Sequence, residues 1–380
     1  MPLSLRSNRA RWAVPGVGAV LVTAVLVVAP MGADASPKLP PRTPAELLAS
    51  TRAAAGHPFS GTVVETARLG LPELPSSGRH GSTGLSLASL VTGSHTARVW
   101  YAGPDRSRVA LVGDLAETDV IRSGRDVWTW DSAKNTAQHR TLPTRSTPDH
   151  PSPSTLPPGQ AASQALAAID PTTAVSVDGT ASVAGRAAYE LVLRPRDTRS
   201  LVGQVRLAVD SATSTPLRVE IFTRTNTTTP AFVTAFTSVT FATPSASVFT
   251  FRPPPGAKVS EQQASGQAGG TDHSATPKAH GAAPKAHTSK PKRAGESPTV
   301  LGTGWTSVLV LRGVDATGAT SGPELSALLR SASRVSGPYG SGRMLSTALV
   351  SALLLDDGRL FVGSVTPAVL EQAAASASAR

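Results

Sequence analysis

The feature that most constrains the fold is a long series of short strand-like segments separated by tight turns. These segments span residues 59–68, 96–101, 107–112, 117–122, 126–131, 136–142, 174–183, 186–194, 202–210, 216–224 and 230–241. Turn residues such as Gly103-Pro-Asp105 and Ser123-Gly-Arg125 separate several of them. Parallel neighbours would need crossover connections of a dozen or more residues, and most of these gaps are shorter. The spacing therefore predicts an antiparallel meander.

Several of these segments alternate apolar and polar residues. Tyr189, Leu191 and Leu193 lie opposite Glu190 and Arg194 on one segment. On the next, Val205, Leu207 and Val209 lie opposite Gln204, Arg206 and Asp210. Because successive side chains of a strand point to opposite faces, this pattern gives the sheet one dry face. The sequence alone leaves open which face is concave.

Two helices are predicted to cover that dry face. Thr43-Pro-Ala-Glu46 has the residues of a helix start, with proline at the first helical position and a glutamate that reaches back to the cap. Residues 159–169 form a second amphipathic pattern, with Leu166 and Ile169 on one side. A sheet with an exposed apolar face needs such a covering layer.

The large sheet is expected to end at Phe249-Thr-Phe-Arg-Pro-Pro-Pro-Gly256. Its alternating aromatic residues predict a last strand. Consecutive prolines end that strand, because proline has no N–H to donate to the neighbouring strand. Residues 257–297 are then rich in Gly, Ser, Ala, Pro, Lys and His, and predict a disordered linker. Its lysines either touch anionic lipid or belong to a solvated tether.

Residues 298–375 are predicted to form a small α+β domain after the linker. A strand is expected at 305–311, a helix at 323–331 and a hairpin from 343–355 and 359–365. Asp356-Asp357-Gly358 is interpreted as the turn of this hairpin. A last helix is expected from Thr366-Pro367 to about residue 375.

Residues 1–35 are predicted to be an export signal. Arg6, Arg9 and Arg11 precede an uncharged apolar run at 12–29, and Ala33-Asp-Ala35 supplies the small residues of a cleavage site before Ser36. An uncleaved anchor helix is the alternative, because about 18 apolar residues suffice to span a bilayer. Either interpretation predicts an extracytoplasmic protein of the cell envelope or membrane surface.

Composition narrows the functional classes. The chain has 380 residues and no cysteine, which excludes disulfides, thiolate metal sites and a cysteine nucleophile. The formal net charge of +11 accompanies many Ala, Gly and Arg residues, so it is weak support for a nucleic-acid partner, and none is expected. The sequence has neither a His-Glu-x-x-His nor a Gly-x-Ser-x-Gly motif. We therefore expect no enzyme activity, no cofactor and no metal.

Three sequence motifs, which follow one another along the chain, resemble those of a known family. They are Trp100-Tyr-Ala-Gly-Pro104-Asp, Ser123-Gly-Arg-Asp-Val-Trp128-Thr-Trp130 and Phe249-Thr-Phe-Arg-Pro-Pro-Pro-Gly256. Together they resemble the LolA-like lipoprotein carriers, including the related anti-sigma-factor regulator RseB, over about residues 43–260. One departure is Gly103, where the Gram-negative carrier has an arginine that helps to hold its lid shut. That lid-latch role is therefore not assigned here.

The resemblance implies a mainly β, α+β fold: an unclosed antiparallel β-barrel, or half-barrel, over residues 43–256, with plug helices on a cavity that holds acyl chains. The candidate cavity residues are Trp100, Trp128, Trp130, Tyr189, Leu191, Leu193, Val205, Leu207, Val209, Phe232 and Phe236. Trp128 and Trp130 share one face of a strand, where they either line the ligand or belong to the core.

Two functions follow from the resemblance. The first is an exported carrier of lipid or lipoprotein acyl chains, which passes them to a membrane-associated delivery protein. The alternative is an RseB-like envelope-stress sensor that regulates a membrane-bound anti-sigma factor. RseB-type proteins likewise pair a large LolA-like domain with a smaller C-terminal one.

Overall fold

The computed structural model describes residues 37–70, 92–113, 116–142, 157–262, 298–314 and 329–378. The predicted export signal at 1–35 and most of the predicted linker lie outside these residues. Within the described residues, no helix is both long and apolar enough to cross a membrane.

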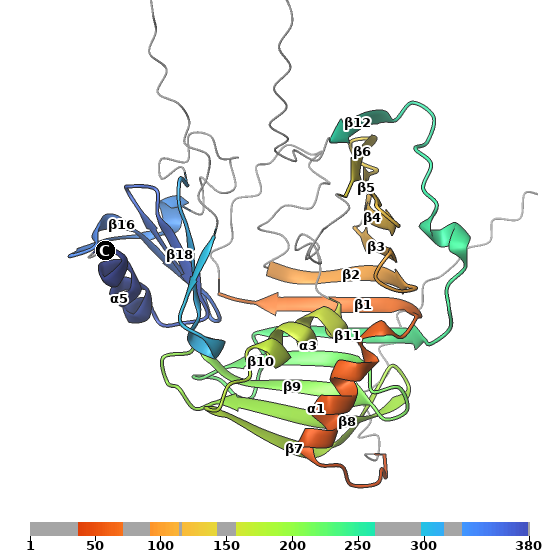
Figure 1. Cartoon of the computed structure of the whole chain (residues 1–380), viewed down its shortest axis with the longest axis horizontal. Helices are drawn as coiled ribbons and strands as arrows, with labels where there is room; N and C mark the ends of the chain where they lie inside the picture. The colour runs from red at the N-terminus through yellow and green to blue at the C-terminus, as the bar shows by residue number, and fades with distance from the viewer. Residues whose placement is uncertain are drawn as a thin grey trace, which may run out of the picture. The chain divides into compact units, whose positions relative to one another are not determined.

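The described residues contain one large sheet of twelve strands (Figure 1). In chain order the strands are β1 (Phe59–Arg68), β2 (Thr92–Tyr101), β3 (Arg106–Val112), β4 (Glu117–Ser123), β5 (Asp126–Asp131), β6 (Thr136–Thr141), β7 (Thr173–Val183), β8 (Arg186–Pro195), β9 (Val202–Asp210), β10 (Pro216–Thr223), β11 (Phe232–Thr240) and β12 (Lys258–Gln262). Their spatial order is β12-β6-β5-β4-β3-β2-β1-β11-β10-β9-β8-β7.

Two meanders make up this sheet, and β1 joins them by pairing with β2 on one side and β11 on the other. The pairs within each meander are antiparallel, which confirms the predicted meander. β12 and β7 are the two ends of the strand order and do not pair, so the sheet stays open. The predicted fold class, a mainly β unclosed half-barrel, is confirmed.

The end of the sheet differs from the prediction. Residues 246–249 form a 3₁₀ turn, η2 (Ala246–Phe249), and Phe249 is 2% exposed, so the aromatic alternation here serves burial and not a strand ladder. After the prolines the chain turns at Gly256, whose φ is +78°, and returns as β12, parallel to β6. The predicted strand at Phe249–Phe251 is therefore wrong, and the sheet continues past the predicted boundary at residue 256.

Two short helices lie over the β7–β11 part of the sheet (Figure 1). In α1 (Pro44–Ala53) the predicted capping box is present: the Thr43 N–H donates to Glu46 Oε2 at 2.8 Å, and the Glu46 N–H donates to Thr43 Oγ1 at 3.3 Å. The second helix is α3 (Pro158–Ala167), which packs on β10 and β11. Both predicted covering helices are thus present.

The C-terminal domain is a second, six-stranded sheet within the described residues. Its elements are β13 (Thr299–Leu301), η3 (Gly304–Thr306), β14 (Val308–Leu311), β15 (Ser333–Gly337), β16 (Gly340–Ser346), β17 (Ser351–Leu355), β18 (Leu360–Gly363) and α5 (Pro367–Ser378). α5 packs on β17 and β18, where Leu370 and Ala374 join a buried cluster with Leu353 and Phe361. The predicted small α+β domain is confirmed.

Three details of this domain differ from the prediction. Trp305 lies in the 3₁₀ turn η3, so the strand expected at 305–311 begins at Val308. The single strand expected at 343–355 is two strands, because Thr347 Oγ1 accepts the Val350 N–H at 3.0 Å and closes a turn between β16 and β17. The helix expected at 323–331 falls largely outside the described residues.

Candidate functional site

The candidate site is a continuous apolar surface on three neighbouring strands, here called the apolar wall. Cross-strand pairing places Leu191 beside Leu207, and Leu207 beside Val219. Every side chain of the wall is between 0% and 4% exposed. Its members are Tyr189, Leu191 and Leu193 of β8, Val205, Leu207 and Val209 of β9, and Val219 of β10. Six of the predicted cavity residues therefore share one surface.

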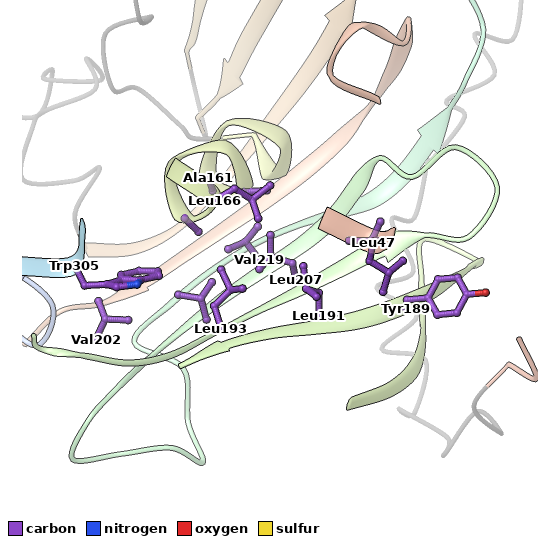
Figure 2. Packing of buried hydrophobic residues seen from close by; sticks show 14 of the residues in the cluster. Leu47, Ala161, Leu166, Tyr189, Leu191, Leu193, Val202, Leu207, Val219 and Trp305 are labelled. Atoms are coloured by element: carbon purple, nitrogen blue, oxygen red, sulfur yellow. The ribbon is translucent and has the colours of Figure 1, made fainter. Parts of the chain in front are cut away.

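The two helices cover this wall with mostly small side chains (Figure 2). α1 contributes Leu47, which is fully buried. α3 contributes Leu166 together with three alanines, Ala161, Ala162 and Ala165. A large aliphatic surface is thus covered by a thin layer.

The wall ends at a surface depression beside Tyr189. This depression has a volume of about 620 Å³ and is lined by Leu39, Pro40, Pro41, Arg42, Glu46, Tyr189 and Ser211. The Tyr189 hydroxyl donates to the Pro40 carbonyl at 2.8 Å, and the Arg42 guanidinium lies 5.6 Å from the centre of the Tyr189 ring. Apolar side chains, the Arg42 cation and the Glu46 carboxylate therefore meet beside the Tyr189 end of the wall.

The tryptophans of the prediction lie outside the wall cluster. Strand pairing places Trp100, Arg108, Ile121, Trp128 and His139 in one row. The Trp128 ring stacks on His139 at 4.4 Å between centroids. Phe251, in the segment after η2, lies 5.3 Å from Trp128 and 5.9 Å from Trp130. Trp128 and Trp130 therefore pack against residues 246–257, here called the strap, and not against the leucines of β8 and β9.

The two predicted phenylalanines lie in different clusters. Phe232 is half-buried and packs against the apolar wall. Phe236 is 3% exposed and belongs to a separate cluster with Val63 and Val99, where its ring meets Phe59 edge-on at 5.6 Å. The prediction thus gathers residues that the structure divides among three apolar groups.

A buried ion pair supports the strap that crosses the tryptophan row. Arg108 Nη2 donates to Asp119 Oδ2 at 2.6 Å, and Arg108 Nη1 lies 3.5 Å from the Val248 carbonyl, within η2. Burial raises the pKa of Asp119 to about 6, although the Arg108 charge opposes the shift. Asp119 Oδ1 and Arg108 Nε are buried and have no hydrogen-bond partner. The pair therefore carries a desolvation cost.

A histidine joins β12 to the rest of the sheet. His139 Nδ1 lies 2.7 Å from Glu261 Oε2, and His139 Nε2 lies 3.0 Å from Asp126 Oδ1. Burial acts to lower the pKa of His139, but the hydrogen bonds and charges of the two carboxylates outweigh it, so the pKa is raised. A protonated His139 bridges β5, β6 and β12.

Besides Val219 of the wall, sequence reasoning missed two residues that come from the C-terminal domain. Trp305 and Leu349 belong to the same buried cluster as the apolar wall, although both come from the C-terminal domain. Each is less than 9% exposed. The sequence signal that could have found them is a large apolar side chain in a connecting turn. Such a side chain is buried only if another part of the chain covers it.

The described part of the chain brings together no group of three His, Cys, Asp or Glu side chains placed to hold a metal ion. What the arrangement offers is apolar surface behind two short helices, with Arg42 and Glu46 at its rim. Shelter of an apolar ligand is the chemistry that such a surface supports.

No protein-family model matches this sequence, and no curated protein matches it by sequence. Among solved structures, the chain is similar to a chain of the Pseudomonas aeruginosa MucA/MucB complex, at 16% identity and a TM-score of 0.42, with 87% of this chain and 96% of that chain covered. It is also similar to a LolA superfamily protein from Nitrosomonas europaea, at 12% identity and a TM-score of 0.22, covering 56% and 99%.

A third similar structure is LprF from Mycobacterium bovis, at 11% identity and a TM-score of 0.28, with 52% of this chain and 91% of that chain covered. The LolA-like resemblance predicted from the three sequence phrases is confirmed as a likeness. At these identities and TM-scores a likeness transfers no function, so the proposed function stands on the contacts within this chain.

Proposed function

We propose that this protein is an exported carrier that shelters lipid acyl chains on the apolar wall of β8–β10. The observation that carries the proposal is the mismatch between the wall and its cover. Seven large side chains form the wall, whereas α3 meets it with three alanines and Leu166. A cover of small side chains adds little apolar burial of its own, so another apolar occupant can replace it on the larger surface.

The energetics favour exchange of α3 for a ligand. Burial of three methyl groups and one leucine side chain stabilises the docked α3 by about 4–5 kcal/mol. Each acyl methylene that becomes buried gains about 0.8 kcal/mol, so about six of them offset the loss of α3 contacts. A palmitoyl chain has more than twice that number. An acyl chain therefore has enough apolar surface to displace the helix.

The N-terminal end of α3 has no side-chain cap. Its N-cap residue is Pro157, and the Gln160 and Ala161 N–H groups donate to the Pro157 backbone carbonyl, at 2.9 and 3.1 Å. The helix end is therefore without the added stability of a capping side chain. The depression beside Tyr189 is the proposed entrance. Glu46 also lines it but accepts hydrogen bonds from Thr43, which leaves Arg42 as the group proposed to meet an anionic head group. The ligand is thus proposed to be an anionic amphiphile with a long acyl chain.

The test measures binding of a fluorescent palmitate analogue to the full chain and to variants. Leu207→Asp is expected to weaken binding by tenfold or more, because it places a charge in the wall. Val259→Asp is the matched control, since Val259 is 50% exposed on β12 of the same sheet. Equal affinity of wild type and Leu207→Asp would refute the site.

A second variant guards against a misfolded Leu207→Asp protein. Leu166→Ala removes the largest α3 contact with the wall, which costs the docked helix about 2 kcal/mol. We expect it to raise the affinity for palmitate about tenfold or more. Unchanged affinity, with no lipid found by mass spectrometry after extraction of the purified protein, would contradict the carrier function.

A sensor is the second candidate function. The observation that favours it is the presence of Trp305 and Leu349, from the C-terminal domain, in the same buried cluster as the wall. Occupancy of the wall then bears on what the C-terminal domain contacts, such as a membrane-bound regulator. Transporter genes beside this gene would favour the carrier, and a sigma and anti-sigma gene pair would favour the sensor.

A further inference from the structure

Trp305 packs in the same buried cluster as the apolar wall, although it belongs to the C-terminal domain. It lies in η3, between β13 and β14, and is 8% exposed. Figure 2 shows its indole beside Val202 and Leu193, at the end of the cluster opposite Tyr189. A tryptophan buries about 150–250 Å² of surface, so it fills a substantial part of that end.

The indole is tied to the turn that follows α3. Trp305 Nε1–H donates to Thr173 Oγ1 at 2.9 Å, and the Thr173 hydroxyl donates to Asp170 Oδ1 at 3.1 Å. Asp170 also accepts the Thr172 N–H at 2.9 Å, which orders the turn. Because α3 ends at Ala167, the helix that covers the wall and the tryptophan that fills its end share one hydrogen-bonded turn.

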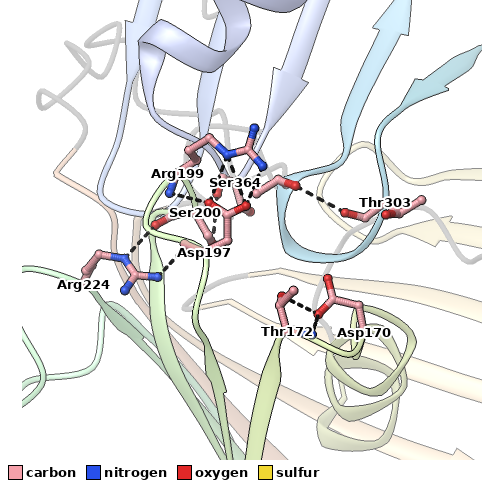
Figure 3. A network of polar contacts seen from close by, with 9 residues as sticks. Asp170, Thr172, Asp197, Arg199, Ser200, Arg224, Thr303 and Ser364 are labelled. Atoms are coloured by element: carbon pink, nitrogen blue, oxygen red, sulfur yellow. Dashed lines mark hydrogen bonds and ion pairs between the residues drawn. The ribbon is translucent and has the colours of Figure 1, made fainter.

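The backbone around Trp305 is built for this close approach. A Cβ atom at Gly304 would collide with Oδ2 of Asp170, and Gly304 has a φ of +62°. Glycine is the residue that tolerates both conditions. Figure 3 shows Asp170 and Thr172 next to the loop that carries Thr303.

A short backbone seam completes the contact between the two sheets. Ser200 pairs with Val365 in an isolated antiparallel bridge, the Leu201 N–H donates to the Ser364 carbonyl at 2.9 Å, and the Thr366 N–H donates to the Arg199 carbonyl at 3.0 Å. Figure 3 shows Ser200 and Ser364 at this seam. The seam holds the C-terminal domain in place while Trp305 sits in the wall.

We propose that Trp305 is an intramolecular occupant of the acyl site, and that a long acyl chain displaces it and so undocks the η3 side of the C-terminal domain. This inference rests on the proposed function. A chain that enters beside Tyr189 follows β8 for about 13 Å before Leu193, which is shorter than a palmitoyl chain and longer than an octanoyl chain. Coupling is reciprocal, so a partner that holds the domain undocked also raises ligand affinity.

The experiment uses a disulfide that can be closed and opened in one protein. The chain contains no cysteine, so Ser200→Cys with Val365→Cys introduces a single pair. Bridged antiparallel residues have Cα atoms about 4.5–5.5 Å apart, which suits a disulfide. The oxidised form holds the domain docked, and the reduced form is its own control for folding.

We expect the oxidised protein to bind the palmitate analogue at least tenfold more weakly than the reduced protein, and an octanoate analogue equally in both states. Trp305→Ala is expected to raise palmitate affinity at least tenfold and to remove the effect of the disulfide. Equal palmitate affinities of the oxidised and reduced forms would overturn the inference, as would an unchanged affinity of Trp305→Ala.

Failure of the carrier function and failure of the role of Trp305 give different results. If neither the wild type nor Leu166→Ala binds palmitate, the carrier function itself is wrong. If the wild type binds and Leu207→Asp does not, but the disulfide and Trp305→Ala have no effect, the site stands and the role of Trp305 is refuted.

Discussion

The buried pair of Arg108 and Asp119 predicts an unusual pH dependence of stability. The Asp119 side chain is 4% exposed, and its pKa is raised from 3.8 to about 6 by burial. The folded state therefore holds this proton more tightly than the unfolded chain does. Stability from this group is fully present below pH 3.8 and is lost as the pH rises through about 6.

The size of the effect follows from the shift. One pKa unit corresponds to about 1.4 kcal/mol, so the full shift of Asp119 is worth about 3 kcal/mol, of which about 2 kcal/mol is lost between pH 4 and pH 7. Glu117, 3.7 Å from Arg108, acts in the same direction because its negative charge also raises the pKa of Asp119. Most ionised carboxylates in ion pairs give the opposite slope.

Urea unfolding, followed by tryptophan fluorescence at pH values from 4 to 7.5, tests this. Asp119→Asn is expected to flatten the profile relative to the wild type, because the titrating group is gone. Asp105→Asn is the control, since Asp105 is 72% exposed in its ion pair with Arg122 and exposed pairs contribute little. If Asp119→Asn and wild type keep the same pH slope, the desolvation argument is wrong.

Two further predictions concern His139 at one edge of the large sheet and Gly304 in the C-terminal domain. The raised pKa of His139 stabilises the folded state below its ordinary pKa of 6.5, and this contribution is lost as the pH rises through the folded value. The protection of the amides of residues 258–262, measured relative to their intrinsic exchange rates, is therefore expected to fall above neutral pH in the wild type but not in His139→Gln. In urea unfolding, Gly304→Ala is expected to destabilise the chain by more than Gly313→Ala. An alanine at either position must adopt a positive φ, which costs about 1–2 kcal/mol. Only at Gly304 would the added Cβ also collide with another atom, because a Cβ at Gly313 meets nothing within 4 Å. Equal losses in the two glycine variants would contradict the close approach of Asp170.

The helices and strands could be predicted because the patterns that specify them lie within a few consecutive residues. Strands β1 and β5 match the predicted ranges 59–68 and 126–131, and α1 begins at the predicted proline after Thr43. Alternation with a period of two is visible within one strand, and it placed Leu191 and Leu207 on one dry face before any pairing was known. A capping box likewise needs four consecutive residues.

What the sequence by itself determined was which segments are strands and helices and which of their faces are apolar. The tertiary structure decided the partners: β1 with β11, β12 with β6 after the prolines, Phe251 on Trp128 and Trp130, and Trp305 on the wall. The reason is physical. An apolar side chain must be buried, but its own sequence does not say against which surface, because that depends on which distant surfaces the rest of the chain leaves uncovered.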